Sequence, residues 1–205
     1  SGVATNVVIA SVTKNDDNPL AGGETIIRVN LTITGTVSGN ETIEIKPVAD
    51  SIYDAVGNAA SNTETTGALT LNDEYNPLVI SYSPADGATG VGINDDLVIV
   101  FNDSMVKGTG NIVIYNGGTF ETIAVGDVTL SQTNVANDTV TIDPSGTFAG
   151  ETGYYVQIAA TAFDDDAGNS YAGITNNTDW NFTVADVAVP TISNASLAAS
   201  HADVG

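Results

Sequence analysis

Short segments in which apolar and polar residues alternate recur along the whole chain, and they are rich in Val, Ile and Thr. Clusters of Gly, Asn and Asp separate these segments, and the periodicity of an amphipathic helix is nearly absent. The pattern is typical of β-sandwiches, so we predict an all-β fold. In the N-terminal part, strands are expected at Val7 to Thr13, Thr25 to Thr34, Glu41 to Lys46 and Ala68 to Leu71. In the C-terminal part, they are expected at Leu78 to Ser83, Asp95 to Phe101, Asn111 to Tyr115, Val128 to Gln132, Thr139 to Ile142, Tyr154 to Ala159 and Asp179 to Val184.

The parity of residues within each strand predicts which side chains face the core. Trp180 and Phe182 share one parity, so we expect the single Trp of the chain in the core rather than on a ligand-binding surface. Tyr154 and Tyr155 are adjacent and therefore point to opposite faces, which makes Tyr155 a candidate for exposure. The other positions that alternation assigns to the core are Val98, Val100, Ile112, Ile114, Val140, Ile142, Val156, Ile158 and Val184.

One sequence pattern occurs twice: the segments 52–58 and 163–169 both end in Asp-x-x-Gly-Asn. Each copy is followed by a stretch rich in Thr and Asn, then an alternating strand, then a proline four residues further on (Pro77 and Pro190). An internal repeat of this kind predicts tandem immunoglobulin-like β-sandwiches. We place a first module at residues 1–73, a second at 74–186, and the start of a further, truncated repeat at 187–205.

The charge balance is strongly acidic, with 25 Asp and Glu against 4 Lys and Arg and a net charge of −21. Nucleic acids and anionic membrane surfaces require a basic footprint, so neither is an expected partner, and no apolar run is long enough to insert into a membrane. Two explanations of the charge stay open. It serves solubility, including adaptation to salt, or some of the carboxylates bind cations.

Three ordered motifs in the second module resemble the bacterial immunoglobulin-like domain first described in S-layer proteins. They are Ser-Pro-Ala-Asp-Gly-Ala at 83–88, Leu-Val-Ile-Val-Phe-Asn-Asp-Ser-Met at 97–105 and Asp-Asp-Ala-Gly-Asn at 165–169. Asn102 and Asp103 stand where the family has Ser-Glu, and the first module lacks the first two motifs. The segment 108–114 is similar to a variant that is common in long adhesins. The resemblance implies an extracellular, repetitive stalk of a bacterial surface protein, and no activity of the module itself.

The first candidate metal site is the acidic run Asp164, Asp165 and Asp166 with Asn169 in the turn that follows. Ca²⁺ takes six to eight oxygen ligands, and three adjacent carboxylates repel one another unless a positive charge lies between them. Gly168 permits the positive φ that bends the chain around an ion. The alternative is a plain turn in which Asp caps backbone amides, and we favour that alternative for the single acid of the 54–58 copy.

The second candidate metal site is the linker between the modules, where Asp73 and Glu74 lie, with Asp186 at the corresponding place after the second module. A neighbouring loop would complete the site, so that the ion fixes the angle between modules. The alternative is that these acids are ordinary solvated linker residues. The possible donors from other loops are Asp16, Asp17, Asp95, Asp96 and Asp103.

Enzymatic chemistry is not expected. The chain has no Cys, and its single His, His201, lies in the incomplete tail, so the ligands of a zinc site and the members of a nucleophilic triad are missing. We therefore predict structural extender modules of a secreted or cell-surface bacterial adhesin, with Ca²⁺ as the cofactor and neighbouring modules of the same chain as partners. The alternative is a module that binds a surface glycan or protein ligand with the help of Ca²⁺.

Overall fold

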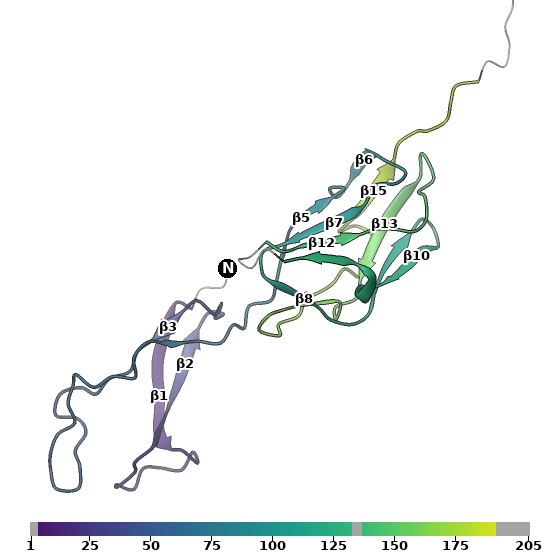
Figure 1. The fold of residues 1–205 in the computed structure, drawn as a ribbon. Helices are drawn as coiled ribbons and strands as arrows, with labels where there is room; N and C mark the ends of the chain where they lie inside the picture. The colour runs from purple at the N-terminus through teal and green to yellow at the C-terminus, as the bar shows by residue number, and fades with distance from the viewer. Residues whose placement is uncertain (1–3, 133–136, 192–205) are drawn as a thin grey trace, which may run out of the picture.

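The computed structural model describes residues 4–132 and 137–191, and it shows two bodies of β-structure that follow one another along an elongated chain (Figure 1). The described residues form fifteen strands and one short 3-10 helix, η1 (Val125–Asp127). The all-β prediction is therefore confirmed. No helix in the described part of the chain is long and apolar enough to cross a membrane.

The second module is a sandwich of two main sheets. The first sheet has five strands in the order β10 (Thr119–Ala124), β9 (Asn111–Tyr115), β13 (Gly153–Ile158), β15 (Asn181–Val184) and β6 (Ala88–Val91). The second has four strands in the order β11 (Thr129–Ser131), β12 (Thr139–Ile142), β7 (Leu97–Phe101) and β5 (Val79–Ser83). A short ladder of β8 (Met105–Lys107) with β14 (Phe163–Asp165) closes the end that faces the first module.

The core of the second module is aromatic and aliphatic, and Trp180 lies fully within it, as its parity predicts. Trp180 stacks on Tyr82 with ring centroids 4.6 Å apart, and its indole N–H donates to the Pro84 carbonyl at 2.8 Å. The prediction that Tyr154 and Tyr155 point to opposite faces is also confirmed, because Tyr154 is buried and Tyr155 lies on the outer face, where it is half-buried rather than fully exposed.

The predicted face of β7 was wrong. The strand buries Leu97, Ile99 and Phe101 completely, whereas Val98 and Val100 are only half-buried on the other side. Every residue of this strand is apolar, so alternation cannot distinguish its two faces. The larger side chains fill the space between the sheets, and Phe101 packs against Phe163 and Tyr171 there.

Four strands of the second module were not predicted: β6, β8, β10 and β14. The most informative is β14, because it contains Asp164 and Asp165, which the sequence places in a loop. Strand β14 pairs with β8 in the register Asp165 to Met105, and strand alternation then turns Asp165 inward, where it is 2 % exposed. A tertiary partner has outweighed the low strand propensity of Asp.

The first module contains the four predicted strands, arranged as two separate two-stranded sheets. Strand β1 (Asn6–Lys14) pairs with β2 (Ile27–Thr34), and β3 (Thr42–Ile43) pairs with β4 (Leu69–Thr70), all antiparallel. Val37 is the one buried hydrophobic residue among those described here, and several apolar side chains of β1 and β2 are exposed. After β15, residues 187–191 form no strand, and the rest of the predicted third repeat, including His201, lies outside the described residues.

The packing of the second module predicts the cost of truncating Phe101, the buried last residue of β7. Phe101→Ala is expected to lower the free energy of unfolding of this module by about 3–5 kcal/mol, because the fully buried ring leaves a cavity. Ile80→Ala on the neighbouring strand β5 is the matched control; Ile80 is 56 % exposed, so its loss is expected to be within about 0.5 kcal/mol. Urea unfolding of both variants measures the difference, and equal losses would contradict the assigned core.

Candidate metal centre between the modules

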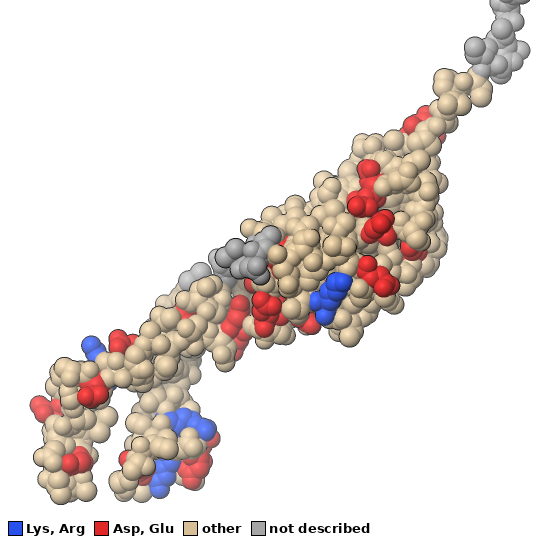
Figure 2. Space-filling view, viewed as in Figure 1, with Lys and Arg blue, Asp and Glu red and all other residues tan. Residues whose placement is uncertain are grey.

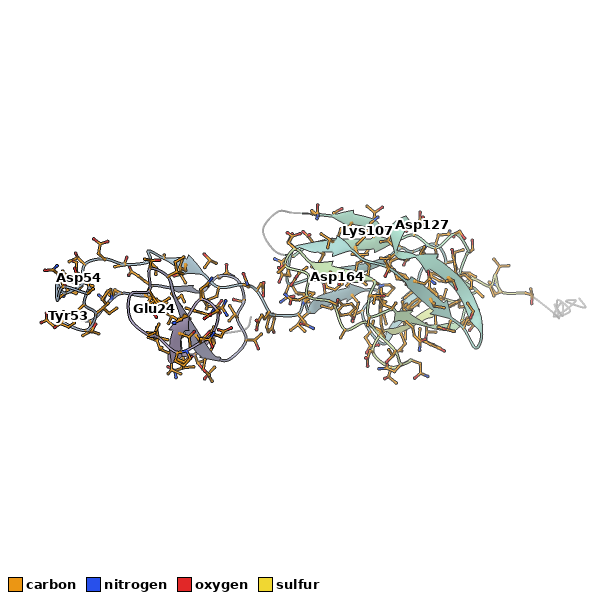
Figure 3. All side chains as sticks on the ribbon, turned by 90° about the horizontal axis from the view of Figure 1, so that it is seen from below. Glu24, Tyr53, Asp54, Lys107, Asp127 and Asp164 are labelled. Atoms are coloured by element: carbon orange, nitrogen blue, oxygen red, sulfur yellow. The ribbon has the colours of Figure 1, made fainter. Side chains whose placement is uncertain are left out.

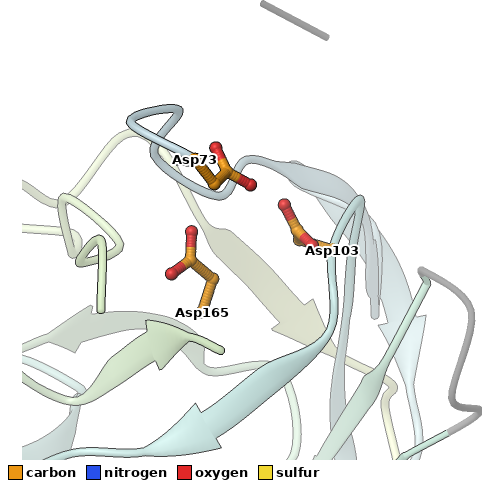
Figure 4. A group of neighbouring side chains, drawn as sticks. All are labelled: Asp73, Asp103 and Asp165. Carbon is orange, nitrogen blue, oxygen red and sulfur yellow. The ribbon is translucent and has the colours of Figure 1, made fainter. Parts of the chain in front are cut away.

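Three carboxylates from distant parts of the sequence meet where the two modules join. Asp73 comes from the linker after β4, Asp103 from the loop between β7 and β8, and Asp165 from the end of β14. One carboxylate oxygen of each lies within 4.8 Å of the corresponding oxygens of the other two. Figure 4 shows the three side chains pointing toward one another. Strand ends and a linker thus supply an acidic group that no single segment contains.

Asp165 is held by its own turn. Its Oδ1 accepts hydrogen bonds from the backbone amides of Ala167 at 2.9 Å and Asn169 at 2.8 Å. Its Oδ2 accepts from the Asn169 side-chain amide at 2.9 Å. Gly168 has φ of 93°, which is the left-handed conformation that the turn requires. The carboxylate is therefore fixed in position and turned toward the linker.

Asp103 is positioned by a buried acid that the sequence did not single out. Asp138 is fully buried, its Oδ2 accepts from the Met105 amide at 2.8 Å, and its own amide donates to the Asp103 carbonyl at 3.3 Å. Asn102, which replaces the family's Ser, accepts from the Leu78 amide at 2.6 Å and so ties the linker to this loop. Asn102 and Asp103, the two residues that differ from the family pattern, therefore both make contacts at the junction between the modules.

Asp73 lies in contact with both modules. Its Oδ1 accepts from the Tyr75 amide at 2.8 Å, and its carbonyl accepts from the Asn169 side chain at 3.2 Å. On the other side, the Glu74 amide donates to the Val37 carbonyl at 2.9 Å. Gly39 of the first module has φ of 74° and approaches so closely that a Cβ there would be 3.1 Å from the Cβ of Asp73. Any ligand of Asp73 is therefore in a position to affect how the modules sit.

The electrostatics of the group are repulsive. Burial raises the pKa of Asp103 above its ordinary value, and repulsion from Asp165, Asp73 and Asp166 adds to this, against a lowering by the Ser104 amide. The two ion pairs found in the described residues, Lys14 with Glu24 and Arg28 with Asp17, do not involve the group. Figure 2 shows that acidic side chains are spread along the visible face, with few basic ones among them.

The structure brings together three of the seven residues that the sequence proposes as ligands, and it combines the two candidate sites into one. The other four do not belong to the group. Asp164 points away along β14 and accepts from the Ser170 hydroxyl, while Asp166 and Glu74 are exposed. Asn169 supports the site through its side-chain amide, which donates to Asp165 and to the Asp73 carbonyl. Among the possible donors from other loops, Asp103 is the one that reaches the linker.

The 54–58 copy of the turn has the same internal hydrogen bonds. Asp54 accepts from the amides of Val56 and Asn58 and from the Asn58 side chain, and the Asn58 side-chain hydrogen bond is the largest influence that lowers the pKa of Asp54. Figure 3 shows Asp54 at the end of the first module that lies far from the second. The amides of the turn itself thus satisfy the Asp carboxylate in both copies, and the difference at Asp165 is the presence of Asp73 and Asp103.

The two packed antiparallel sheets of the second module define the class of immunoglobulin-like β-sandwich modules. The model of the bacterial Ig-like domain family matches residues 73–184, more than half of the chain, so the chain belongs to this family. Domains of this family are structural modules rather than catalytic ones, and they occur in surface proteins. No curated protein sequence matches the chain.

The raised pKa of Asp103 predicts how stability depends on pH in the presence of a chelator. A carboxyl group whose pKa is higher in the folded state stabilises the fold when protonated and loses that contribution as the pH rises through the folded pKa. Asp103→Asn is therefore expected to increase the free energy of unfolding at pH 7 by up to about 1 kcal/mol, since the site is partly exposed. The gain should shrink as the pH is lowered toward the ordinary Asp value. Urea unfolding of both proteins in EDTA at pH 7 and pH 4 tests this, and a variant less stable than the parent at pH 7 would contradict it.

Proposed function

We propose that this chain is a pair of extender modules of a secreted or cell-surface bacterial protein, and that Ca²⁺ held by Asp73, Asp103 and Asp165 fixes the angle between them. The observation that carries the proposal is the convergence of these three carboxylates on the linker. The surface charge and the membership of the bacterial Ig-like family support it. An adhesin or S-layer-like parent is the finer part of the same proposal.

The donor set suits Ca²⁺ rather than a transition metal. Ca²⁺ binds oxygen ligands at 2.3–2.6 Å, so two ligands on opposite sides of one ion are about 5 Å apart. One carboxylate oxygen of each acid lies within 4.8 Å of the corresponding oxygens of the other two, a spacing that one ion can span. All three donors are hard carboxylate oxygens, whereas Zn²⁺ sites are built mainly from Cys and His. Backbone carbonyls and water would supply the remaining ligands.

Binding there would couple ion concentration to mechanical stiffness. Without an ion, the three negative charges repel the linker from the second module, and the hydrogen bonds of Asn169 and Leu78 oppose that repulsion. With an ion, the same charges pull the linker onto the loops of β7 and β14. A ligand that binds only the folded state stabilises it by about 2.7 kcal/mol at a hundredfold excess over Kd, so even a weak site would be effective at millimolar Ca²⁺.

A second candidate function is glycan binding, which one observation favours. Tyr115 and Tyr155 stack on the outer face of the five-stranded sheet, with ring centroids 4.8 Å apart and planes 10° from parallel, and both are half-buried. Asn181 lies beside Tyr155 on the next strand and offers a polar group. A sugar could pack against the accessible part of this Tyr pair, so a glycan array compares the parent protein with Tyr155→Ala. Glycan binding by the parent protein that is lost in Tyr155→Ala would support this function. No glycan binding by the parent protein would rule it out.

The proposal predicts that Ca²⁺ raises the melting temperature of the chain relative to EDTA. Asp73→Asn and Asp103→Asn are each expected to weaken Ca²⁺ binding at least tenfold, because each removes one of three charged ligands. Asp96→Asn is the matched control; Asp96 is an exposed acid just before β7 and outside the group, so its affinity should equal that of the parent. Titration calorimetry measures all four proteins, and equal affinities would place any bound ion elsewhere.

The effect on shape is a separate prediction. Small-angle scattering in Ca²⁺ is expected to give a narrower distribution of module–module distances than scattering in EDTA. Asp103→Asn should give the broad distribution in both conditions, whereas Asp96→Asn should behave as the parent does. A distribution that is unchanged by Ca²⁺ while calorimetry reports binding would mean that the ion stabilises the second module without fixing the junction.

A further inference from the structure

The first module follows the second half of the second module in the order of its strands, except that β14 has no counterpart strand. Strands β1, β2, β3 and β4 occur in the order of β11, β12, β13 and β15, and the Asp-x-x-Gly-Asn turn lies before the last strand in both. The pairings also agree, because β1 pairs with β2 as β11 pairs with β12, and β3 pairs with β4 as β13 pairs with β15. The crossing between the two sheets begins with Gly-Thr-Val at 35–37 and with Gly-Thr-Phe at 146–148.

Equivalent apolar positions differ in burial. At five of these positions the second-module side chain is at most 2 % exposed, whereas its first-module counterpart is half-buried or exposed; the pair Val37 and Phe148 is buried in both modules. Ile52 is 48 % exposed, and its counterpart Phe163 is fully buried against Phe101. The other pairs, first module before second, are Val29 and Val140, Leu31 and Ile142, Ile43 and Tyr154, and Ile45 and Val156.

This difference in burial arises from two strands of the second module, β7 and β9, whose side chains pack against these positions. Strand β7 pairs with the free edge of β12, and β9 pairs with the free edge of β13, both antiparallel. Together they insert five completely buried side chains: Leu97, Ile99, Phe101, Ile112 and Ile114. In the described part of the first module, no strand pairs with the corresponding edge of β2 or of β3. An apolar groove remains, made of two adjoining hollows of about 460 and 410 Å³. Ile9 and Ile45 line both hollows, Val29 lines the first, and Leu31 lines the second.

We infer that residues 1–73 form the C-terminal half of an immunoglobulin-like sandwich, and that their apolar groove receives the complementary N-terminal half. The partner is a polypeptide segment with two apolar strands, which pair antiparallel with β2 and β3 as β7 and β9 pair with β12 and β13. Main-chain hydrogen bonds to the open strand edges provide affinity, and alternate Leu, Ile and Phe side chains fill the groove. This inference does not depend on Ca²⁺ binding.

A second copy of the chain is a poorer occupant. Two grooves placed face to face would cover apolar surface but leave the edges of β2 and β3 without main-chain partners. Each copy also carries a net charge of −21, so association between copies is opposed by repulsion. A donor strand satisfies both the apolar face and the open edge, which is the arrangement that the second module shows within itself.

The test uses the full chain and a synthetic peptide with the sequence of residues 95–103, Asp-Asp-Leu-Val-Ile-Val-Phe-Asn-Asp, which contains β7. We expect saturable binding of the labelled peptide by fluorescence anisotropy and chemical-shift changes confined to residues 4–73. A scrambled peptide of the same composition should not bind. The β7 sequence is used because, in the second module, this strand pairs with β12 and its alternate apolar side chains fill the core. It is therefore this chain's own example of a strand that completes such a half-sandwich.

Variants of β2 separate groove binding from general adhesion of an apolar peptide. Leu31→Asp places a charge in the groove and is expected to weaken binding at least tenfold. Thr32→Asp is the matched control; Thr32 is the next residue of the strand, is exposed and points to the opposite face, so its affinity should equal that of the parent. Ile45→Asp, in the segment just after β3, repeats the test from the other wall, and the dispersion of the amide spectrum shows that each variant is folded.

Three outcomes would overturn the inference. The first is that the β7 peptide binds no better than its scrambled form. The second is that Leu31→Asp and Thr32→Asp bind the peptide equally well. The third is that sedimentation of the chain alone shows a dimer that Leu31→Asp dissociates, which would assign the groove to a second copy.

Discussion

The packing of β7 between its neighbours is the interaction on which the rest of this structure depends. The strand lies between β12 and β5, buries Leu97, Ile99 and Phe101, and joins the two sheets of the second module into one core. It also ends at the loop that carries Asp103, so the strand that completes the core positions one member of the acidic group. The described part of the first module has no strand equivalent to β7, and there the edge of β2 has no strand partner and the apolar faces of the sheets are not covered.

The acidic group at the junction is a product of that core. Asp165 faces inward because β14 pairs with β8, and the amides of its own turn solvate the carboxylate in place of water. Asp138 holds the loop of Asp103 from within the core. Asp73 belongs to the linker, which the Asn169 side chain holds against the second module. Three like charges at this distance are tolerated because each is fixed by hydrogen bonds, and a divalent cation would turn their repulsion into an attraction between the linker and the second module.

Much of the architecture was predictable because its signals are local. Alternation and turn residues determined the all-β class, the positions of most long strands, and the burial of Trp180 and Tyr154, since strand periodicity depends only on neighbouring residues. Asp73, Asp103 and Asp165 were all among the residues proposed for ions, because an acid in a linker or a turn is visible without a structure. The two Asp-x-x-Gly-Asn turns were recognisable for the same reason.

Other features were decided by contacts between residues far apart in the sequence. Alternation could not choose the inner face of β7, because both of its faces are apolar, and composition could not show that Asp165 lies on a strand while Asp166 lies outside it. Which loop reaches the linker depends on how two sheets and a short ladder pack, and that information is in no single segment. The sequence alone therefore determined the kinds of element and the acidic residues that are candidates for the junction. Only the tertiary structure decided which of them meet, because long-range strand pairing sets the register that brings Asp73, Asp103 and Asp165 together.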